Sequence, residues 1–332
     1  MRILITGGAG FIGTNLAHYF ARQGHAVRVF DNLSRKGVDA NARWLKEQHP
    51  GLELIQGDVR IAGELERAVQ GAERVYHLAS QVAVTTSVED PRTDFEINLL
   101  GAVNALEAVR KHAPGAPFLF TSTNKVYGGM EEQTIVKRGD RYEYETLVNG
   151  VPETQPLDFH SPYGCSKGGA DQYVRDYARI YGLRTVVFRM SCIFGPHQCG
   201  NEDQGWVAHF ARRALTGQGL SIFGDGRQVR DILYVDDLVR AFALASDNIE
   251  RTSGRIYNIG GGPANTISLL ELIAELERHS GREIPVEFHP WRPGDQRVYI
   301  SDIRRAAEFG WQPAVDKLEG VRRLVEWLRA RI

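Results

Sequence analysis

The feature that most constrains the fold is the opening stretch, where a glycine-rich turn lies between a strand and a helix. Arg2 to Thr6 is a short apolar run, and the sequence GGAGFIG follows it at residues 7–13. A helical pattern then runs to Gln23, a second apolar run covers Ala26 to Phe30, and Asp31 closes the unit. Glycine lets backbone amides approach a pyrophosphate, and the helix N-terminus adds partial positive charge there. This order predicts a dinucleotide-binding unit, with the spacing GxxGxxG in place of GxGxxG.

The acid at the end of the second strand decides between two dinucleotides. Asp31 places a carboxylate where an adenosine ribose donates hydrogen bonds, and the same charge repels a 2′-phosphate. Arg35 and Lys36 follow closely and are cations that favour NADP, but a solvated loop explains them more simply. The sequence therefore predicts NAD. Asp58, which follows a predicted strand at residues 52–56, is a candidate partner for the adenine amine.

Strand and helix patterns alternate through the first part of the chain. Beyond the opening unit they predict strands at 52–56, 74–78, 118–121 and 185–189, and helices at 64–69, 91–112 and 163–181. This alternation is typical of an α/β fold, here a doubly wound Rossmann sheet of parallel strands with helices on both faces. Ligands bind beyond the carboxyl ends of such strands, where Asp31, Asp58, Ala79 and Thr123 lie.

The character of the chain changes after Arg189, where glycine and proline separate shorter elements. Residues 1–189 are predicted to form the NAD-binding domain, which the chain rejoins at about 231–259. Residues 190–230 and 260–332 are predicted to form a smaller C-terminal substrate-binding lobe. Its predicted helices lie at 206–215, 269–277 and 316–328. The stretch from Met130 to Gln155 lacks core periodicity and is interpreted as a long surface excursion that can form a hairpin.

Tyr163 and Lys167 lie four residues apart, so their side chains share one face of the predicted helix. A tyrosine phenol has a pKa of roughly 10, and a neighbouring ammonium lowers that pKa. Such a pair can take a proton from a substrate hydroxyl while a hydride leaves the same carbon. The YxxxK pattern is common by chance, and a helix that merely carries both residues is the alternative. The N-terminal glycine loop favours the catalytic interpretation.

Composition excludes several other classes of protein. The 332 residues, 42% hydrophobic and 24% charged, are ordinary for one large globular domain or two closely joined ones. A net charge of −1 gives no indication of binding to nucleic acid or to an anionic membrane, and no apolar run is long enough to span a bilayer. The three cysteines form no CxxC pair, which fits a reducing, cytoplasmic location. No cluster of histidines or cysteines predicts a metal site.

With the glycine loop, Thr123 and the Tyr163–Lys167 pair in place, the chain resembles the extended short-chain dehydrogenase/reductase family over nearly its whole length. Within that family it is similar to nucleotide-sugar 2-epimerases of the CDP-paratose (CDP-tyvelose) type. The stretches that carry this likeness are 31–37, 121–128, 158–167 and 203–206. The excursion at 130–155 and the loop at 197–200 look less like the family, and both are candidates to line the sugar pocket.

The resemblance implies a tightly held NAD, a nucleotide-diphosphate sugar as substrate, and a homodimer joined by the helices at 91–112 and 163–181. It implies that Thr123, Tyr163 and Lys167 form the catalytic set. The residues implied to contact NAD are Gly7, Gly10, Phe11, Ile12, Gly13, Asp31, Asn32, Asp58, Val59, Leu78, Ala79, Gln81, Asn98, Ser122, Tyr163 and Lys167. Those implied to bind the substrate are Thr123, Asn124, Lys125, Gln204, Arg230 and Arg292. Arginine forks suit a diphosphate, with an ion pair as the alternative, above all for Arg230, which Asp231 follows.

The implied reaction oxidises a ring hydroxyl to a ketone, turns the sugar and returns the hydride to the other face, so that C2 inverts without net redox. A UDP-hexose 4-epimerase is the nearest alternative, because the same groups act on another carbon if the sugar sits differently. A 4,6-dehydratase ranks lower, because those relatives carry an acid directly after the catalytic threonine and this chain has Asn124-Lys125. A nucleotide-sensing protein without turnover also ranks lower, because it has no need to keep the whole catalytic set.

Overall fold

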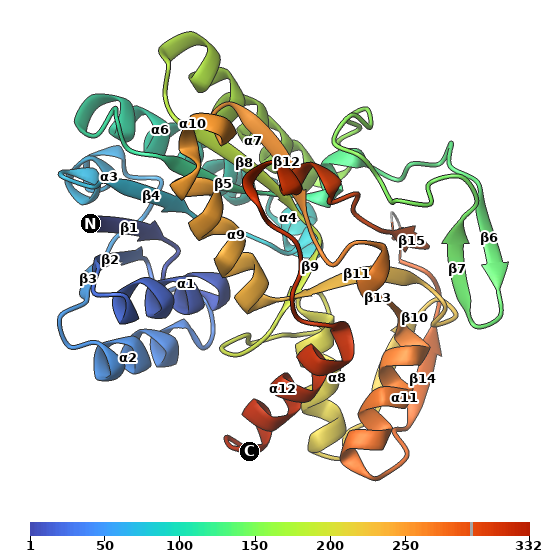
Figure 1. The fold of residues 1–332 in the computed structure, drawn as a ribbon. Coiled ribbons are helices and arrows are strands. Elements are labelled where there is room, and N and C mark those ends of the chain that lie inside the picture. Colours follow the sequence, from blue (N-terminus) through green and yellow to red (C-terminus); the bar gives the residue numbers. More distant parts are fainter. Residues whose placement is uncertain (293–294) are drawn as a thin grey trace.

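The computed structural model describes residues 1–292 and 295–332, and its centre is a parallel sheet (Figure 1). The sheet has seven strands in the order β12-β8-β5-β4-β1-β2-β3, and all neighbours run parallel. The strands are β1 (Arg2–Thr6), β2 (Ala26–Asp31), β3 (Glu53–Gln56), β4 (Arg74–His77), β5 (Phe118–Thr123), β8 (Thr185–Met190) and β12 (Arg255–Ile259). Every residue of β5 is buried, because both faces of the sheet are covered. The predicted doubly wound Rossmann fold is confirmed.

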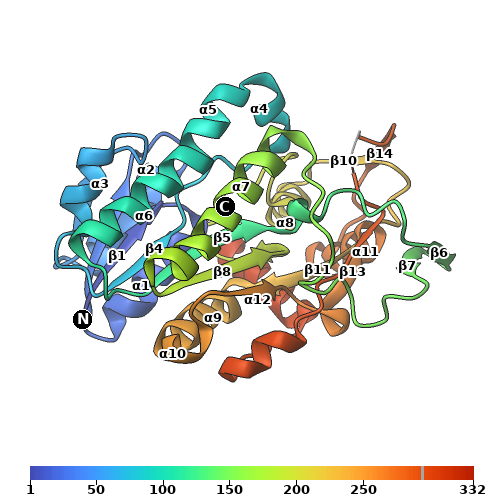
Figure 2. The ribbon, with the colours of Figure 1, turned by 90° about the horizontal axis from the view of Figure 1, so that it is seen from above.

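Helices cover the two faces of this sheet in two groups (Figure 2). One group is α1 (Phe11–Arg22), α2 (Val38–Gln48) and α9 (Val235–Asp247), followed by the short α10 (Ile249–Thr252). The other group is α3 (Ala62–Val69), α6 (Gly101–His112) and α7 (Ser161–Tyr181), with α4 (Val84–Glu89) and α5 (Pro91–Phe95) packed against α7. Two separate apolar cores result, one on each face. Among the described residues, no helix is both long enough and apolar enough to cross a membrane.

Some elements differ from the sequence-based predictions. The predicted helix at 91–112 is continuous but changes pitch, because a π-helical turn at Glu96–Leu100 joins α5 to α6. Helices α2 and α9 were not predicted. Helix α2 begins directly after the Arg35–Lys36 segment that was interpreted as a solvated loop, and α9 buries its apolar face against α1. The interaction that holds α9 in place is therefore made with a helix more than 200 residues earlier in the sequence.

The smaller lobe is built on a second sheet. Strand β11 (Val229–Tyr234) pairs with β9 (Cys192–Phe194), β13 (Thr266–Ser268) and β15 (Val298–Tyr299). A two-stranded sheet of β10 (Leu220–Phe223) and β14 (Val286–His289) and the helices α8 (Trp206–Leu215), α11 (Leu269–Ser280) and α12 (Lys317–Arg329) complete it around their own core. Since β11 belongs to this lobe, the chain returns to the central sheet at α9 and β12 and not at residue 231.

The excursion at 130–155 contains a hairpin, as its sequence allowed, and the hairpin projects at one end of the molecule (Figure 1). Its strands are β6 (Ile135–Arg138) and β7 (Arg141–Tyr144), which pair antiparallel. The Tyr142 hydroxyl donates to Asp225 at 2.8 Å, and the Tyr144 hydroxyl donates to the carbonyl of Val298 at 2.8 Å. The hairpin therefore docks on the smaller lobe.

Candidate active site

A cavity of about 450 Å³ opens at the carboxyl ends of the central strands. We call it the cofactor cavity. Of the residues predicted to contact NAD, those that line it are Gly7, Gly10, Phe11, Ile12, Gly13, Asp31, Asn32, Asp58, Val59, Leu78, Ala79, Gln81, Ser122, Tyr163 and Lys167. The structure thus gathers residues from the ends of β1, β2, β3, β4 and β5 around one space, as expected for a parallel α/β sheet.

The glycine loop packs so tightly against the protein's own backbone that Gly7 and Gly13 leave no room for a side chain. Gly7 has φ +65°, and a Cβ there would lie 2.6 Å from the backbone nitrogen of Ala79. A Cβ on Gly13 would lie 2.3 Å from the carbonyl oxygen of Gly7. Helix α1 begins directly behind the loop at Phe11, so its N-terminal dipole points at the cavity. These features fit the pyrophosphate of a dinucleotide.

The Asp31 carboxylate is held in place by the backbone. One oxygen accepts from the amide of Ala9 at 3.1 Å and the other from the amide of Leu33 at 2.9 Å. Burial raises the pKa of Asp31, and these amide hydrogen bonds act in the opposite direction. Asp31 lies at the end of β2 and on the cavity wall, as required for a carboxylate that accepts hydrogen bonds from the adenosine ribose of NAD.

Two features of this cavity differ from the sequence-based expectations. Asn98 does not line it; the Asn98 side chain lies in the π-helical turn, accepts from the amide of Gln81 at 3.0 Å and donates to the carbonyl of Gln81 at 3.0 Å. Asn98 therefore positions the wall instead of forming it. Arg35 is an exposed loop residue, as interpreted, but it also lines the cavity and donates to the Gln204 side chain at 3.1 Å. Sequence spacing gave no signal for a contact between residues so far apart.

A second cavity, of about 380 Å³, lies between the central sheet and the smaller lobe. We call it the substrate cavity. All of the predicted substrate residues line it, namely Thr123, Asn124, Lys125, Gln204, Arg230 and Arg292. Tyr163 and Ser122 line both cavities, so the cofactor and substrate cavities meet beside the Tyr163 phenol. Gln198 also lines the substrate cavity, as expected for a residue of the loop at 197–200. The excursion at 130–155, which was the other candidate to line the sugar pocket, contributes no residue to the cofactor cavity or the substrate cavity.

The catalytic candidates come from two elements. Thr123 ends β5, and α7, which has Pro162 in its first turn, presents Tyr163 and Lys167 on one face. Burial raises the pKa of Tyr163 to about 12, and a hydrogen bond with the Thr123 side chain lowers it in part. Burial also lowers the pKa of Lys167 to about 7, and its ammonium lies 4.3 Å from the centre of the Phe120 ring.

The sequence predicted that Lys167 lowers the pKa of Tyr163. In the structure the pKa of Tyr163 is raised, and Lys167 is not among the groups that lower it. The groups that lower it are Thr123 and, through its charge, Arg35, and they do not outweigh burial. The reason is that both members of the pair are buried, and burial disfavours the charged form of each. In this arrangement Tyr163 holds its proton near neutral pH, while Lys167 is the group able to gain or lose one.

Both arginines of the substrate cavity are engaged by carboxylates. Arg230 pairs with Asp295 at 2.8 Å, while its neighbour Asp231 bonds to Ser191 instead. Arg292 pairs with Asp203 at 3.0 Å and stacks 3.8 Å from the centre of the Phe223 ring. Pro293 and Gly294, which follow Arg292, lie outside the described residues. The ion-pair alternative is thus confirmed, and both arginines also belong to the wall of the substrate cavity.

Comparison with known proteins decides the family. Residues 3–260, more than half of the chain, match the model described as the NAD dependent epimerase/dehydratase family. The chain belongs to this family. It is 42% identical to the CDP-paratose 2-epimerase of Salmonella typhi over 98% of this chain and 99% of that protein. The resemblance to extended short-chain dehydrogenase/reductases is thereby confirmed, and the cofactor of the family is NAD.

Other members of the epimerase/dehydratase family match at lower identity. The structure of a Thermus thermophilus UDP-glucose 4-epimerase in complex with NAD aligns over the full length of both chains, with 33% identity and a TM-score of 0.82. A dTDP-glucose 4,6-dehydratase from Streptomyces antibioticus is 33% identical over 99% of this chain and 92% of its own. The family thus includes relatives of the three enzyme types that the sequence left open, and its epimerases are isomerases.

Proposed function

We propose that this protein inverts C2 of a CDP-linked sugar by transient oxidation with NAD. The observation that carries the proposal is the position of Tyr163, on the wall that the cofactor and substrate cavities share, with Thr123 beside it. A hydroxyl on a sugar in the substrate cavity can reach this phenol while its carbon faces the cofactor cavity. The identity of 42% to a CDP-paratose 2-epimerase supports the choice of sugar nucleotide.

Each residue of the set has a distinct role in this proposal. NAD, when bound, supplies the acceptor and donor of the hydride. Tyr163 exchanges the proton of the substrate hydroxyl, and Thr123 donates a hydrogen bond that steadies the oxygen. Lys167, whose pKa is lowered to about 7 by burial, takes up or releases the proton that Tyr163 gives or receives. Arg230 and Arg292 hold the diphosphate by exchanging part of their bonding to Asp295 and Asp203.

The residues after Thr123 favour an epimerase over a dehydratase. Asn124 and Lys125 line the substrate cavity, and the amide of Lys125 donates to the Thr123 hydroxyl at 3.2 Å. An amide side chain and an ammonium offer hydrogen bonds to ring hydroxyls but no carboxylate for elimination. Inversion at C4 of a UDP-hexose is the second candidate, favoured by the match to a UDP-glucose 4-epimerase along its whole length.

One experiment tests both which sugar nucleotide is the substrate and whether C2 or C4 is inverted. Purified protein is incubated with CDP-, UDP-, GDP- and dTDP-linked sugars, and epimers are identified by NMR. We expect a new epimer from a CDP-linked sugar, with a primary isotope effect when C2 carries deuterium and retention of the label at C2. A silent label at C2, together with an isotope effect from C4, identifies a 4-epimerase instead.

The protein is expected to purify with NAD(H) bound, because a reaction without net redox needs no exchange of cofactor. Denaturation followed by chromatography of the supernatant identifies the released dinucleotide. Asp31→Asn is expected to lower the NAD content, because it removes the charge at the end of β2. Asp39→Asn, which changes a carboxylate that lines neither cavity, is the matched control. Release of NADP(H) from the unmodified protein contradicts the argument from Asp31.

We infer a homodimer formed through α5, α6 and α7. Their outer surface carries exposed apolar side chains, among them Phe95, Leu100 and Tyr173, which are 46%, 38% and 48% exposed. Light scattering is expected to give twice the chain mass of 37.1 kDa. Leu100→Asp combined with Tyr173→Asp is expected to give monomers, whereas Phe288→Asp, at an exposed site on the smaller lobe, is expected to leave the mass unchanged. A monomeric wild-type protein contradicts this assembly.

A cytosolic location is likewise proposed. Cys165, Cys192 and Cys199 are free thiols, and two of them are exposed. Free exposed thiols suit a reducing compartment. Fractionation of source cells tests this, and recovery of the protein outside the cytosol contradicts it.

A further inference from the structure

A buried ion pair lies one helical turn beyond Lys167 on α7. Asp171 is 0% exposed and Arg189, at the end of β8, is 2% exposed. The Arg189 Nε donates to one Asp171 oxygen at 2.9 Å, and its Nη2 donates to the other at 3.0 Å. Neither residue lines the cofactor or the substrate cavity. The guanidinium therefore occupies both oxygens of Asp171 without facing any ligand.

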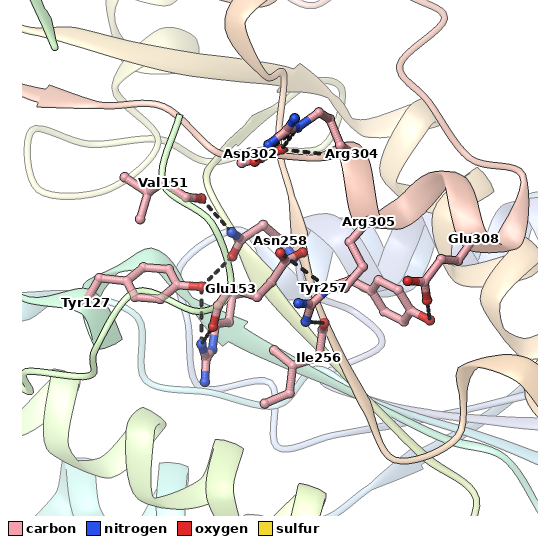
Figure 3. Close-up of polar contacts among 11 residues, drawn as sticks. Tyr127, Val151, Glu153, Ile256, Tyr257, Asn258, Asp302, Arg304, Arg305 and Glu308 are labelled. Atoms are coloured by element: carbon pink, nitrogen blue, oxygen red, sulfur yellow. Dashed lines mark hydrogen bonds and ion pairs between the residues drawn. The ribbon is translucent and has the colours of Figure 1, made fainter. Parts of the chain in front are cut away.

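The Arg189 guanidinium is fixed on its other side by a polar network. Its Nη1 donates to the Tyr127 hydroxyl at 3.1 Å, and that hydroxyl donates to the Asn258 side chain at 2.7 Å. The Asn258 side chain donates to the carbonyl of Val151 at 2.8 Å, and the backbone N–H of Asn258 donates to the Glu153 carboxylate at 2.9 Å. Figure 3 shows Tyr127 and Asn258 pointing toward each other, with Val151 and Glu153 beside them. Through Tyr127 these contacts link Arg189 to three separate segments, which restrains its orientation toward Asp171.

Lys167 is within the electrostatic influence of two carboxylates. Asp94 from α5 and Asp171 from its own helix both raise the pKa of Lys167, against the larger effect of burial. His77 from β4 also senses the Lys167 charge, which lowers the pKa of His77. Asp94 accepts from Ser166 and from Asn98, so neutral donors satisfy it. Asp171 accepts from the neutral Gln172 side chain at 2.7 Å and has Arg189 as its cationic partner.

The spacing makes Asp171 a competitor for the catalytic lysine. Asp171 follows Lys167 by four residues, so their side chains are neighbours on α7. A buried carboxylate without a cationic partner is costly, and a lysine stem is flexible enough to turn toward it. We propose that Arg189 is a positioning residue that occupies both oxygens of Asp171 and so leaves Lys167 directed into the cofactor cavity. The inference rests on the proposed role of Lys167 in proton exchange.

The test is a double-mutant cycle read at Lys167 itself. The chain has seven lysines, so protein with ¹³C at lysine Cε gives few NMR signals, and Lys167→Arg identifies the relevant one. Arg189→Met is expected to raise the pKa of Lys167 by about one pH unit or more, the size expected when a nearby opposite charge is unmasked. Asp171→Asn, which leaves an unpaired guanidinium nearby, is expected to lower it. The double variant is expected to return it close to the wild-type value, because a neutral pair replaces an ion pair.

A control variant distinguishes a role of Arg189 in positioning Lys167 from a role in stabilising the fold alone. Arg304→Met breaks another arginine–aspartate pair, Arg304–Asp302, in which the arginine side chain is exposed, and is expected to leave the Lys167 titration unchanged (Figure 3). If one single variant fails to fold, the other single variant and the double variant still give a signed shift. Equal shifts in both single variants, or none, would show that the pair only stabilises the fold. The measurement needs no substrate, so it stands apart from the identity of the sugar nucleotide.

Discussion

Tyr163→Phe is expected to lower turnover by about 10⁴-fold, the upper end of the range for loss of a general acid–base group, while fold and NAD content are retained. Tyr163 is among the residues that line both cavities, and a hydrogen bond with the Thr123 side chain acts to lower its pKa. The phenylalanine ring keeps the packing of the buried tyrosine but has no oxygen to exchange a proton. Turnover of the sugar nucleotide, the dinucleotide content and the melting temperature of the variant check this result.

Tyr76→Phe is the matched control for that substitution. Tyr76 is also buried, burial raises its pKa to about 12, and its hydroxyl bonds to Ser246 on the far side of the fold. Loss of this hydroxyl is expected to lower the free energy of unfolding by about 1 kcal/mol, the typical net contribution of one hydrogen bond. Turnover is expected to stay unchanged. If Tyr163→Phe keeps a near-normal rate, Tyr163 is not the acid–base group and the reaction uses another donor.

The elements that the sequence predicted well are those with local signals. The GGAGFIG turn, the apolar run before it and Asp31 after it determine the β1–α1–β2 unit by chain geometry alone. Thr123 could be placed at a strand end because it closely follows the strand predicted at 118–121, and the structure extends β5 to Thr123 with all six residues buried. Residues at such strand ends meet at one edge of a parallel sheet, which is why so many of the predicted NAD contacts line the same cavity.

The contacts that could not be predicted from the sequence are made between residues far apart in the chain. Arg230 pairs with Asp295 and not with the adjacent Asp231, and Arg35 reaches Gln204 across 169 positions. Asn98 was predicted to touch NAD, yet the π-helical turn aims it at the loop that carries Gln81. The predicted activation of Tyr163 by Lys167 overlooked burial, which acts on both groups and cannot be counted from their spacing. Each of these differences comes from tertiary packing and not from local preference.

Lys167→Met is expected to give a protein that is less active and more stable. Turnover is expected to fall roughly 10²-fold or more, within the range for loss of a group that transfers a proton. The methionine stem fills the space over the Phe120 ring, where the ammonium now lies 4.3 Å from the ring centre. It also removes a charge that the fold disfavours, because burial lowers the pKa of Lys167 from 10.5 to about 7.

The sign of the stability change follows from the protons bound in each state. Between pH 7 and about 10.4, the pKa of an unfolded lysine, the unfolded chain binds more protons at this position than the folded one, so wild-type stability rises with pH there. The penalty from Lys167 is complete below pH 7 and vanishes above the unfolded pKa. Lys167→Met is thus expected to melt at a higher temperature than wild type at pH 6.5, with a smaller difference at pH 9.5. Scanning calorimetry at both pH values, with matched dinucleotide content, measures the two melting temperatures. If the difference between the variant and wild type grows with pH, the pKa of Lys167 is not lowered by burial.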